Sequence, residues 1–174
     1  FITREAVLSS RIEGTQATLS EILAADSGVS VKQNPDDLQE VQNYIKALDY
    51  GIKRLQELPL SLRLIKEIHG SLMQGVRGSH ATPGEFRRTQ NWIGSPGCTL
   101  NTAKFVPVPP DHLMDALSEL ESFLHNRQLP PLIHIALCHY QFEAIHPFLD
   151  GNGRVGRLLI TLLLIEQKML PSPL

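Results

Sequence analysis

Hydrophobic residues recur three or four positions apart along most of the chain, which is the spacing of one face of an α-helix. The clearest run begins at Asn34-Pro35-Asp36, where an asparagine can cap a helix and a proline fits its first turn, and it extends to residue 55. Further helices are predicted over residues 3–25, with a break near Gly14, and over 61–75, 111–124, 132–145 and 152–169. The last two are apolar on nearly every side, so we expect them at the centre of an all-α bundle.

Residues 78–110 depart from this pattern and are rich in proline and glycine. Two short pieces with β-forming residues, 89–93 and 104–108, flank Gly94-Ser95-Pro96-Gly97, which predicts a two-stranded hairpin. Two strands are too few to be stable alone, so we expect the hairpin to lie over the helical body as a flap. Phe86 and Trp92 are candidates for apolar anchors beneath this flap.

The composition fits one globular domain. The 174 residues include 16 basic and 18 acidic side chains, for a net charge of −2, and 42% are hydrophobic, so a core is feasible without disulfides or metal clusters. Two cysteines exclude a zinc ribbon or a disulfide scaffold and favour a reducing compartment, so we expect a cytoplasmic protein. We expect no nucleic-acid or membrane binding, because there is neither a basic stripe nor an apolar run of the ~20 residues that span a bilayer. The chain starts at Phe1 without a leader pattern, so we expect a domain trimmed from a longer protein.

The chemistry-bearing residues concentrate in residues 146–157, between the two apolar helices. Gly151-Asn152-Gly153 forms a loop of small residues at a predicted helix start, where backbone N–H groups without helical partners can bind an anion. Arg154 and Arg157 are three residues apart, so both are expected on one side of the first helical turn, where guanidinium groups can grip phosphate oxygens. Two arginines suggest a polyphosphate ligand.

Two further residues of this stretch complete a reactive set. Asp150 offers a hard oxygen ligand suited to Mg²⁺ that bridges phosphate groups, and His146 can accept a proton near neutral pH. Taken singly, each residue is more often a cap, a turn residue, a solvated charge or a core histidine. Their joint occurrence in twelve residues indicates a phosphoryl or nucleotidyl transfer site.

Three other motifs overlap this stretch and fail. Gly151, Gly153 and Gly156 have the spacing of a dinucleotide-binding fingerprint, but that fingerprint follows a strand and this loop follows a predicted helix. The phosphate-loop pattern requires Lys followed by Ser or Thr where this chain has Arg157-Leu158. A calcium loop would need Glu at its twelfth position, where Thr161 stands.

The stretch 146–157 resembles the signature of Fic-domain proteins, H-x-F-x-(D/E)-G-N-(G/K)-R-x-x-R, at every specified position. The resemblance implies a single Fic domain over residues 1–174, with a helical bundle and an inserted β-hairpin flap. It also implies transfer of AMP from ATP to a hydroxyl side chain of a target protein, with release of pyrophosphate. The glycine before the first arginine is typical of AMP transfer rather than phosphorylation.

The resemblance implies a role for each signature residue. The base that deprotonates the target hydroxyl would be His146, the loop anchor Phe148, and the Mg²⁺ ligand Asp150. The triphosphate would be bound by Gly151, Asn152, Gly153, Arg154, Gly156 and Arg157.

A second resemblance lies near the N-terminus. Residues 9–14, from Ser9 to Glu13 and Gly14, resemble the inhibitory motif (S/T)-x-x-x-E-(G/N) of many Fic proteins, which makes 1–25 the inhibitory helix region. The resemblance implies that Glu13 pairs with Arg157 and so prevents productive ATP binding. Without the signature, a helix that ends at Gly14 with a solvated Glu13 would be the simpler interpretation.

Residues 84–110 resemble the family's flap, which pairs with the target backbone by strand addition. The residues expected to dock the target are Thr89, Gln90, Asn91, Trp92 and Ile93. For Trp92 alone, an anchor under the flap is the simpler interpretation.

The partner implied is a target protein with a Ser, Thr or Tyr hydroxyl, and self-modification and a homodimer are open alternatives. The same site with another nucleotide donor, net removal of AMP, and a non-catalytic ATP-sensing module are the rival functions.

Overall fold

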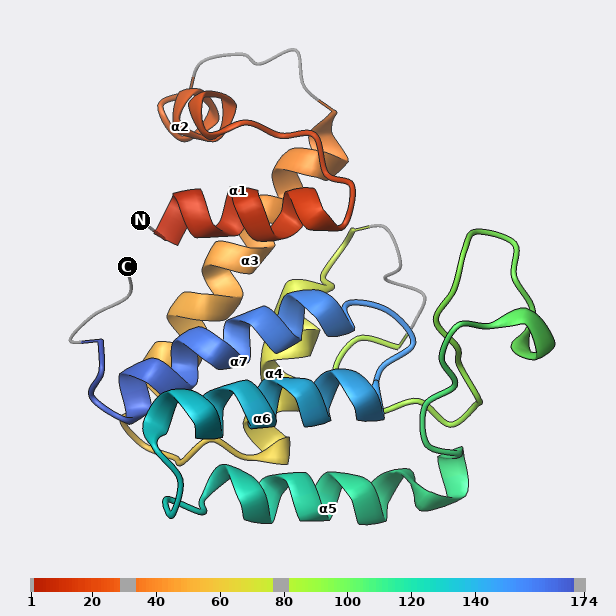
Figure 1. The fold of residues 1–174 in the computed structure, drawn as a ribbon. Coiled ribbons are helices and arrows are strands. Elements are labelled where there is room, and N and C mark those ends of the chain that lie inside the picture. Colours follow the sequence, from red (N-terminus) through yellow and green to blue (C-terminus); the bar gives the residue numbers. More distant parts are fainter. Residues whose placement is uncertain (1, 29–33, 77–81, 171–174) are drawn as a thin grey trace.

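The computed structural model of the chain describes residues 2–28, 34–76 and 82–170. These residues contain seven α-helices and no strand, and they form a helical bundle with one long loop at its side (Figure 1). The helices are α1 (Ile2–Ile12), α2 (Leu19–Asp26), α3 (Pro35–Arg54), α4 (Leu62–Leu72), α5 (Leu113–Leu124), α6 (Pro131–Ile145) and α7 (Asn152–Glu166). Two 3₁₀ turns, η1 (Leu100–Thr102) and η2 (Pro110–His112), lie in the loop and before α5. No helix among these residues is long and apolar enough to cross a membrane.

The helix starts predicted at Asn34 and Ser61 are confirmed, whereas the helix predicted from residue 111 begins at Leu113, after η2. Asn34 accepts a hydrogen bond from the backbone N–H of Asp36 at 3.1 Å, with Pro35 in the first turn of α3. Ser61 caps α4 by accepting from the backbone N–H of Leu64. The predicted helical region 3–25 is a pair of helices, and Gly14, with φ of +97°, lies in the break between them.

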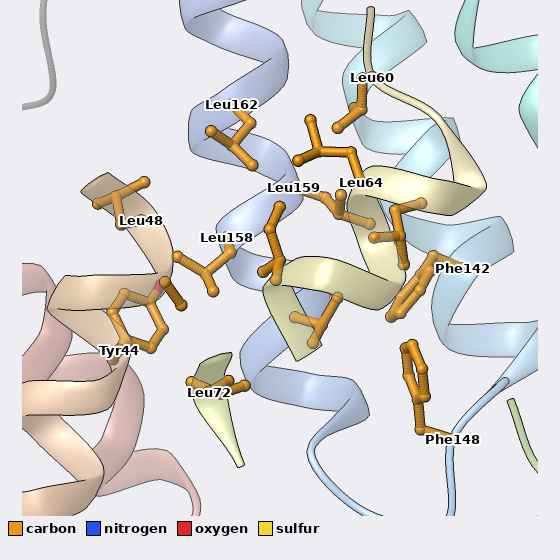
Figure 2. Close-up of a cluster of buried hydrophobic side chains, with 14 of the residues drawn as sticks. Tyr44, Leu48, Leu60, Leu64, Leu72, Phe142, Phe148, Leu158, Leu159 and Leu162 are labelled. Carbon is orange, nitrogen blue, oxygen red and sulfur yellow. The ribbon is translucent and has the colours of Figure 1, made fainter. Parts of the chain in front are cut away.

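The core lies between α3, α4, α6 and α7, whose apolar faces meet in the cluster drawn in Figure 2. Tyr44 and Leu48 of α3 and Leu158 and Leu162 of α7 are fully buried there, and Phe142 of α6 closes the cluster. α7 is therefore central, as predicted, although it ends at Glu166 rather than at residue 169. The loop that joins α6 to α7 lies at one end of this core (Figure 1).

The prediction that α6 is also buried all round was wrong. Its outer face leaves Leu132 64% and Tyr140 70% exposed, with Ile133 and Leu137 beside them. The apolar residues on both sides of this helix hid the difference between its inner and outer faces, so hydrophobic periodicity could not detect it.

The predicted hairpin is reduced to a single antiparallel bridge between Ile93 and Phe105. The Ile93 N–H donates to the Phe105 carbonyl at 2.8 Å, and the Phe105 N–H donates back at 3.1 Å. Pro107 follows two residues later and has no N–H to continue a ladder, which explains why the pairing stops. Trp92 is 42% exposed and donates its indole N–H to the Cys98 carbonyl, so its interpretation as a buried anchor was wrong.

Candidate functional site

The signature loop begins where α6 ends. His146 has a left-handed backbone, with φ of 49° and ψ of 61°, and this turns the chain out of the helix. Gly151 is also left-handed, and a Cβ there would lie 2.9 Å from the Met73 sulfur, so any other residue would be strained at this position. α7 starts at the next residue, which places the end of α6 and the start of α7 on one short loop.

The Asn152 side chain closes this loop. Its Oδ1 accepts from the Phe148 N–H at 2.9 Å and its Nδ2 donates to the Phe148 carbonyl at 2.8 Å, and the side chain is buried. The backbone N–H groups of residues 152–154 have no acceptor in the part of the chain that the structure describes. These are the orphan donors of a helix N-terminus, so the loop can bind an anion through its backbone.

Phe148 anchors the loop in the core, as expected. Its ring is fully buried and stacks on His69 of α4, with ring centroids 3.7 Å apart and planes within 5° of parallel. Phe86 packs against it with centroids 5.2 Å apart, so Phe86 is an anchor between the flap and the bundle.

His69 is a residue that sequence reasoning missed. Its Nδ1 accepts from the Gly84 N–H at 2.8 Å, so its Nε2 carries the proton and donates to the Asp150 carbonyl at 3.0 Å. Burial lowers the pKa of His69 to about 4, so the ring is neutral near pH 7. In the sequence, His69 lies among the apolar positions of a helix, and no local pattern pointed to a loop 81 residues away.

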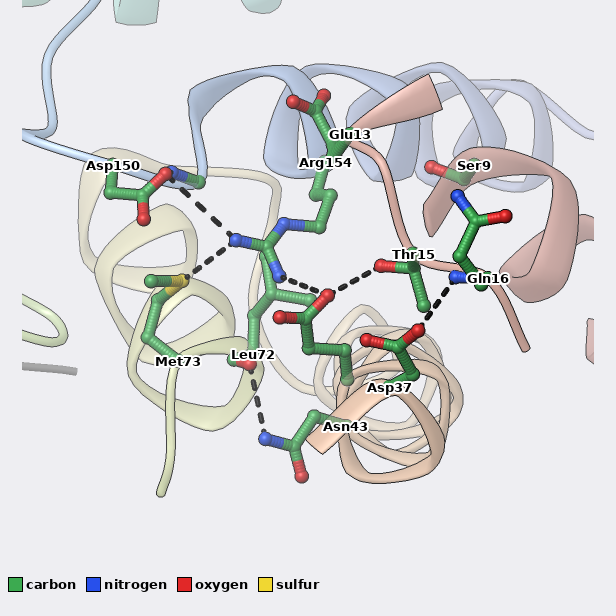
Figure 3. Close-up of polar contacts among 12 residues, drawn as sticks. Ser9, Glu13, Thr15, Gln16, Asp37, Asn43, Leu72, Met73, Asp150 and Arg154 are labelled. Atoms are coloured by element: carbon green, nitrogen blue, oxygen red, sulfur yellow. Dashed lines mark hydrogen bonds and ion pairs between the residues drawn. The ribbon is translucent and has the colours of Figure 1, made fainter. Parts of the chain in front are cut away.

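Arg154 lies inside the protein and has fewer hydrogen bonds than it can make (Figure 3). Its Nη2 is 3.4 Å from the Met73 sulfur and 3.9 Å from Asp150 Oδ1, and its Nη1 is 4.0 Å from Glu40 Oε2. Nε and Nη1 have no hydrogen-bond acceptor among the described residues. Buried donors are normally satisfied, so this guanidinium is suited to bind phosphate oxygens.

Arg157 has a different environment, because it contacts α1. Its Nη2 donates to Glu13 Oε1 at 2.6 Å and to the Ser9 carbonyl at 3.2 Å, and its Nε donates to Ser9 Oγ at 2.7 Å. Glu13 is therefore paired rather than free in solvent. A Cβ at Gly153 would collide with the Glu13 carboxylate, so the glycine leaves room for this pair.

Buried carboxylates of α3 hold the segment after Gly14. Thr15 Oγ1 donates to Glu40 Oε2 at 2.5 Å, and the Gln16 N–H donates to Asp37 Oδ2 at 2.8 Å (Figure 3). Glu40 also faces Arg154, so one carboxylate contacts both the segment after Gly14 and the signature arginine.

The remaining signature residues have distinct places. Asp150 is half-exposed and its Oδ1 accepts from the Gly151 N–H at 2.6 Å. No group of three or more His, Cys, Asp or Glu side chains gathers around a metal position within the described residues, so a cation here would depend on ligand oxygens besides Asp150. Gly156 faces α6, where a Cβ would meet the end of the Glu143 side chain and the His139 ring, so the two helices approach closely at this residue.

His146 is half-buried, and desolvation lowers its pKa below the ordinary value, so the imidazole is neutral near pH 7 and can accept a proton. Of the residues expected to dock a target, Asn91 donates to the His146 carbonyl at 3.1 Å and Gln90 donates to the Pro107 carbonyl at 3.0 Å. Thr89 and Ile93 are exposed, as is Trp92.

Two known protein-family models match the chain. The model of the Fic/DOC family matches residues 59–164, and the model of the Fic/DOC family N-terminal region matches residues 1–53. The chain belongs to the Fic/DOC family. This agrees with the resemblance that residues 146–157 carry in the sequence.

Relatives in the Fic/DOC family include proteins named protein adenylyltransferase Fic. The chain is 34% identical over 165 residues to the one from Drosophila grimshawi and 33% identical over 165 residues to the one from Drosophila virilis. Each comparison covers 89% of this chain and 31% of the relative, so the chain spans about a third of the length of these curated relatives.

Solved structures share the Fic fold. A Fic family protein from Desulfovibrio desulfuricans G20 matches with a TM-score of 0.78 at 28% identity, over 97% of this chain and 49% of that protein. A Fic domain containing signaling protein from Bacteroides thetaiotaomicron matches with a TM-score of 0.82 at 24% identity, over 96% of this chain and 63% of that protein.

Proposed function

We propose that this Fic/DOC chain transfers AMP from ATP to a hydroxyl side chain of a target protein. The observation that carries the proposal is the first turn of α7, where the backbone N–H groups of residues 152–154 and two nitrogens of the Arg154 guanidinium have no hydrogen-bond acceptor among the described residues. A triphosphate supplies the oxygens that these donors lack. The relatives named protein adenylyltransferase support AMP as the transferred group.

The reaction needs few groups from the protein. The target hydroxyl oxygen forms a bond to the α-phosphorus, and the bond from that phosphorus to the oxygen bridging the β-phosphate breaks. The electron pair of that bond leaves with pyrophosphate, and the hydroxyl proton goes to His146. Because this imidazole is neutral near pH 7, it is ready to act as the base. Positioning and charge neutralisation supply most of the rate.

Within this proposal, the N–H groups of Asn152 and Gly153 bind the phosphate chain next to Gly151, while Arg154 and Arg157 hold the β- and γ-phosphates. Asp150 would hold Mg²⁺ together with phosphate oxygens and water, and the ion would neutralise the triphosphate. The exposed carboxylate of Asp150 fits a cation that arrives with the nucleotide.

The same proposal includes autoinhibition by residues 1–25. Arg157 cannot bind Glu13 and a γ-phosphate with the same Nη2, so the ion pair competes with productive ATP binding. The Ser9 hydroxyl and carbonyl hold the guanidinium on α1, which strengthens the competition.

The target would be a Ser, Thr or Tyr side chain docked along the flap, residues 84–110. Thr89, Trp92 and Ile93 are exposed and can contact it, whereas the Asn91 amide is occupied by the signature loop. The free thiols of Cys98 and Cys138 support a reducing compartment, so we propose a cytoplasmic location.

Labelling experiments with ATP test this function. The Glu13→Gly chain should incorporate the label of α-labelled ATP, and no label of γ-labelled ATP, into itself or into proteins of a lysate. Adding His146→Ala should remove the label. Transfer of the γ-label would indicate phosphorylation, and tight ATP binding without transfer would indicate a sensing module. Either result would overturn the proposal.

A further inference from the structure

Arg87 is a buried cation in the flap that no part of the proposed reaction uses. It is 3% exposed, and none of the carboxylates in the described residues pairs with it. Its guanidinium donates instead to four backbone carbonyls, those of Thr89, Val108, Ile145 and His146. Burying a charged group costs free energy unless hydrogen bonds compensate for the lost water. Here the four carbonyls provide those hydrogen bonds, so the guanidinium and the carbonyls hold one another in place.

One of these carbonyls belongs to the base of the proposed reaction. Arg87 Nε donates to the His146 carbonyl at 3.0 Å, and Asn91 Nδ2 donates to the same oxygen at 3.1 Å. Asn91 also donates to the Phe148 carbonyl at 3.0 Å, and the Arg87 backbone N–H donates to the Pro147 carbonyl at 2.9 Å. Three consecutive carbonyls of the signature loop are thus held from the flap.

The backbone at this point needs external support. A non-glycine residue in the left-handed region is strained, and such a conformation persists only where its surroundings hold it. His146 has φ of 49°, and its neighbour Ile145 is the last residue of α6. The hydrogen bonds from Arg87 and Asn91 therefore act at the peptide that sets the direction of the His146 side chain.

We propose that Arg87 and Asn91 are positioning residues that hold the backbone of His146 and thereby place its imidazole for proton transfer. The inference rests on the proposed function, in which His146 is the base. Arg87 also donates to carbonyls on both arms of the flap, at Thr89 and Val108. One guanidinium therefore bonds both the flap, where the target would dock, and the backbone of His146.

The charge of Arg87 adds a separate readout. Desolvation is the main cause of the lowered pKa of His146, and the positive charge of Arg87 lowers it further. The other charges that act on this imidazole are Glu13 and Asp150, which raise its pKa. Removing the charge at residue 87 should raise the pKa of His146, whereas a lysine should not.

The test uses the Glu13→Gly chain as the active reference and measures α-label incorporation against ATP concentration. Arg87→Met should lower the maximal rate about 100-fold and leave the KM for ATP within about threefold, because the phosphate-binding residues keep their places. Arg87→Lys, which retains the charge and some of the hydrogen-bond donors, should have a maximal rate about tenfold higher than that of Arg87→Met. Asn91→Ala, which removes one donor to the His146 carbonyl, should cost about tenfold.

A matched arginine controls for simple loss of stability. Arg127→Met removes an arginine that pairs with Glu166 and precedes α6, whereas His146 follows the other end of that helix, so the change should destabilise the chain without changing the maximal rate. Equal rate losses in Arg127→Met and Arg87→Met, or a loss in Arg87→Met that appears entirely in KM, would overturn the proposal. If Arg87→Met does not fold, an unchanged rate in Asn91→Ala overturns it.

NMR titration of the His146 imidazole, assigned with His146→Ala, separates this inference from the proposed function. A higher His146 pKa in Arg87→Met but not in Arg87→Lys shows that the charge of Arg87 acts on this imidazole, and together with the loss of maximal rate it supports the positioning role. The same pKa in all three chains shows that Arg87 does not act on the imidazole and contradicts the proposal. A Glu13→Gly chain that transfers no label would refute the proposed function while the titration still decides the role of Arg87.

Discussion

Replacement of Glu13 by glutamine removes one negative charge from the contact between α1 and α7 while keeping the size of the side chain. In the wild-type chain, Glu13 Oε1 accepts from Arg157 Nη2 at 2.6 Å. Glutamine can still accept a hydrogen bond from the same nitrogen, but as a neutral group. If this pair competes with a γ-phosphate, the exchange should tighten nucleotide binding without creating any new contact to the nucleotide.

The size of the effect follows from the exposure of the pair. A hydrogen bond that involves charge contributes about 1.5–3 kcal/mol, and a neutral one about 0.5–1.5 kcal/mol. The Glu13 side chain is 39% exposed, so solvent screens part of the attraction, and we expect glutamine to weaken the contact by about 1 kcal/mol. At about 1.4 kcal/mol per tenfold change, ATP should bind about fivefold more tightly to Glu13→Gln.

Calorimetric titration with a non-hydrolysable ATP analogue measures this difference directly. High salt should bring the nucleotide affinities of the two chains closer together, because it screens the exposed ion pair of the wild type. Glu57→Gln is a matched control, since Glu57 is an exposed partner of Arg54. Equal affinity of the wild type and Glu13→Gln, or an equal gain in Glu57→Gln, would refute the competition.

Three further predictions concern stability, each measured by urea unfolding. Thr15→Val removes the hydroxyl that bonds a buried carboxylate and should lower the free energy of unfolding by about 1–3 kcal/mol, whereas Thr15→Ser should not. The pKa of His69 is lowered to about 4 in the folded chain, so as the pH falls the unfolded chain binds a proton at this residue before the folded chain does. The free energy of unfolding should therefore fall by about 3 kcal/mol between pH 6.5 and pH 4, and His69→Gln should reduce this dependence on pH. Gly151→Ala should cost more than Gly14→Ala, because both are left-handed but only a Cβ at Gly151 meets a neighbour, the Met73 sulfur; equal costs would contradict this reasoning.

Local signals made much of the fold predictable. The caps at Asn34 and Ser61 and the break at Gly14 each depend on a few adjacent residues, and the structure places all three where the sequence did. The signature loop was also local, because twelve consecutive residues hold the candidate base, metal ligand and anion site.

The supporting residues of the site could not be predicted, because each acts across a long separation in sequence. His69 reaches the Asp150 carbonyl from α4, and Arg87 reaches the His146 carbonyl from the flap. For Glu40 the sequence carries a weak indication of a buried contact, because a carboxylate beside Val41 and Tyr44 on the buried face of a helix needs a hydrogen-bond or ion-pair partner. The sequence could show that a partner was required but not that it was Thr15.

On the proposed function, the two signature arginines have different roles, Arg154 in phosphate binding and Arg157 in autoinhibition. Arg154 is enclosed by Met73, Asp150 and Glu40, none of which belongs to α1. The side-chain hydrogen bonds that Arg157 makes among the described residues go to Ser9 of α1 and to Glu13, which follows α1 directly. On the proposed function, autoinhibition must therefore act on the phosphate that Arg157 binds, while the anion site at the start of α7 remains preformed. A nucleotide without the γ-phosphate has no group that competes with Glu13 for Arg157, so on the proposed function Glu13 weakens the binding of nucleoside triphosphates in particular.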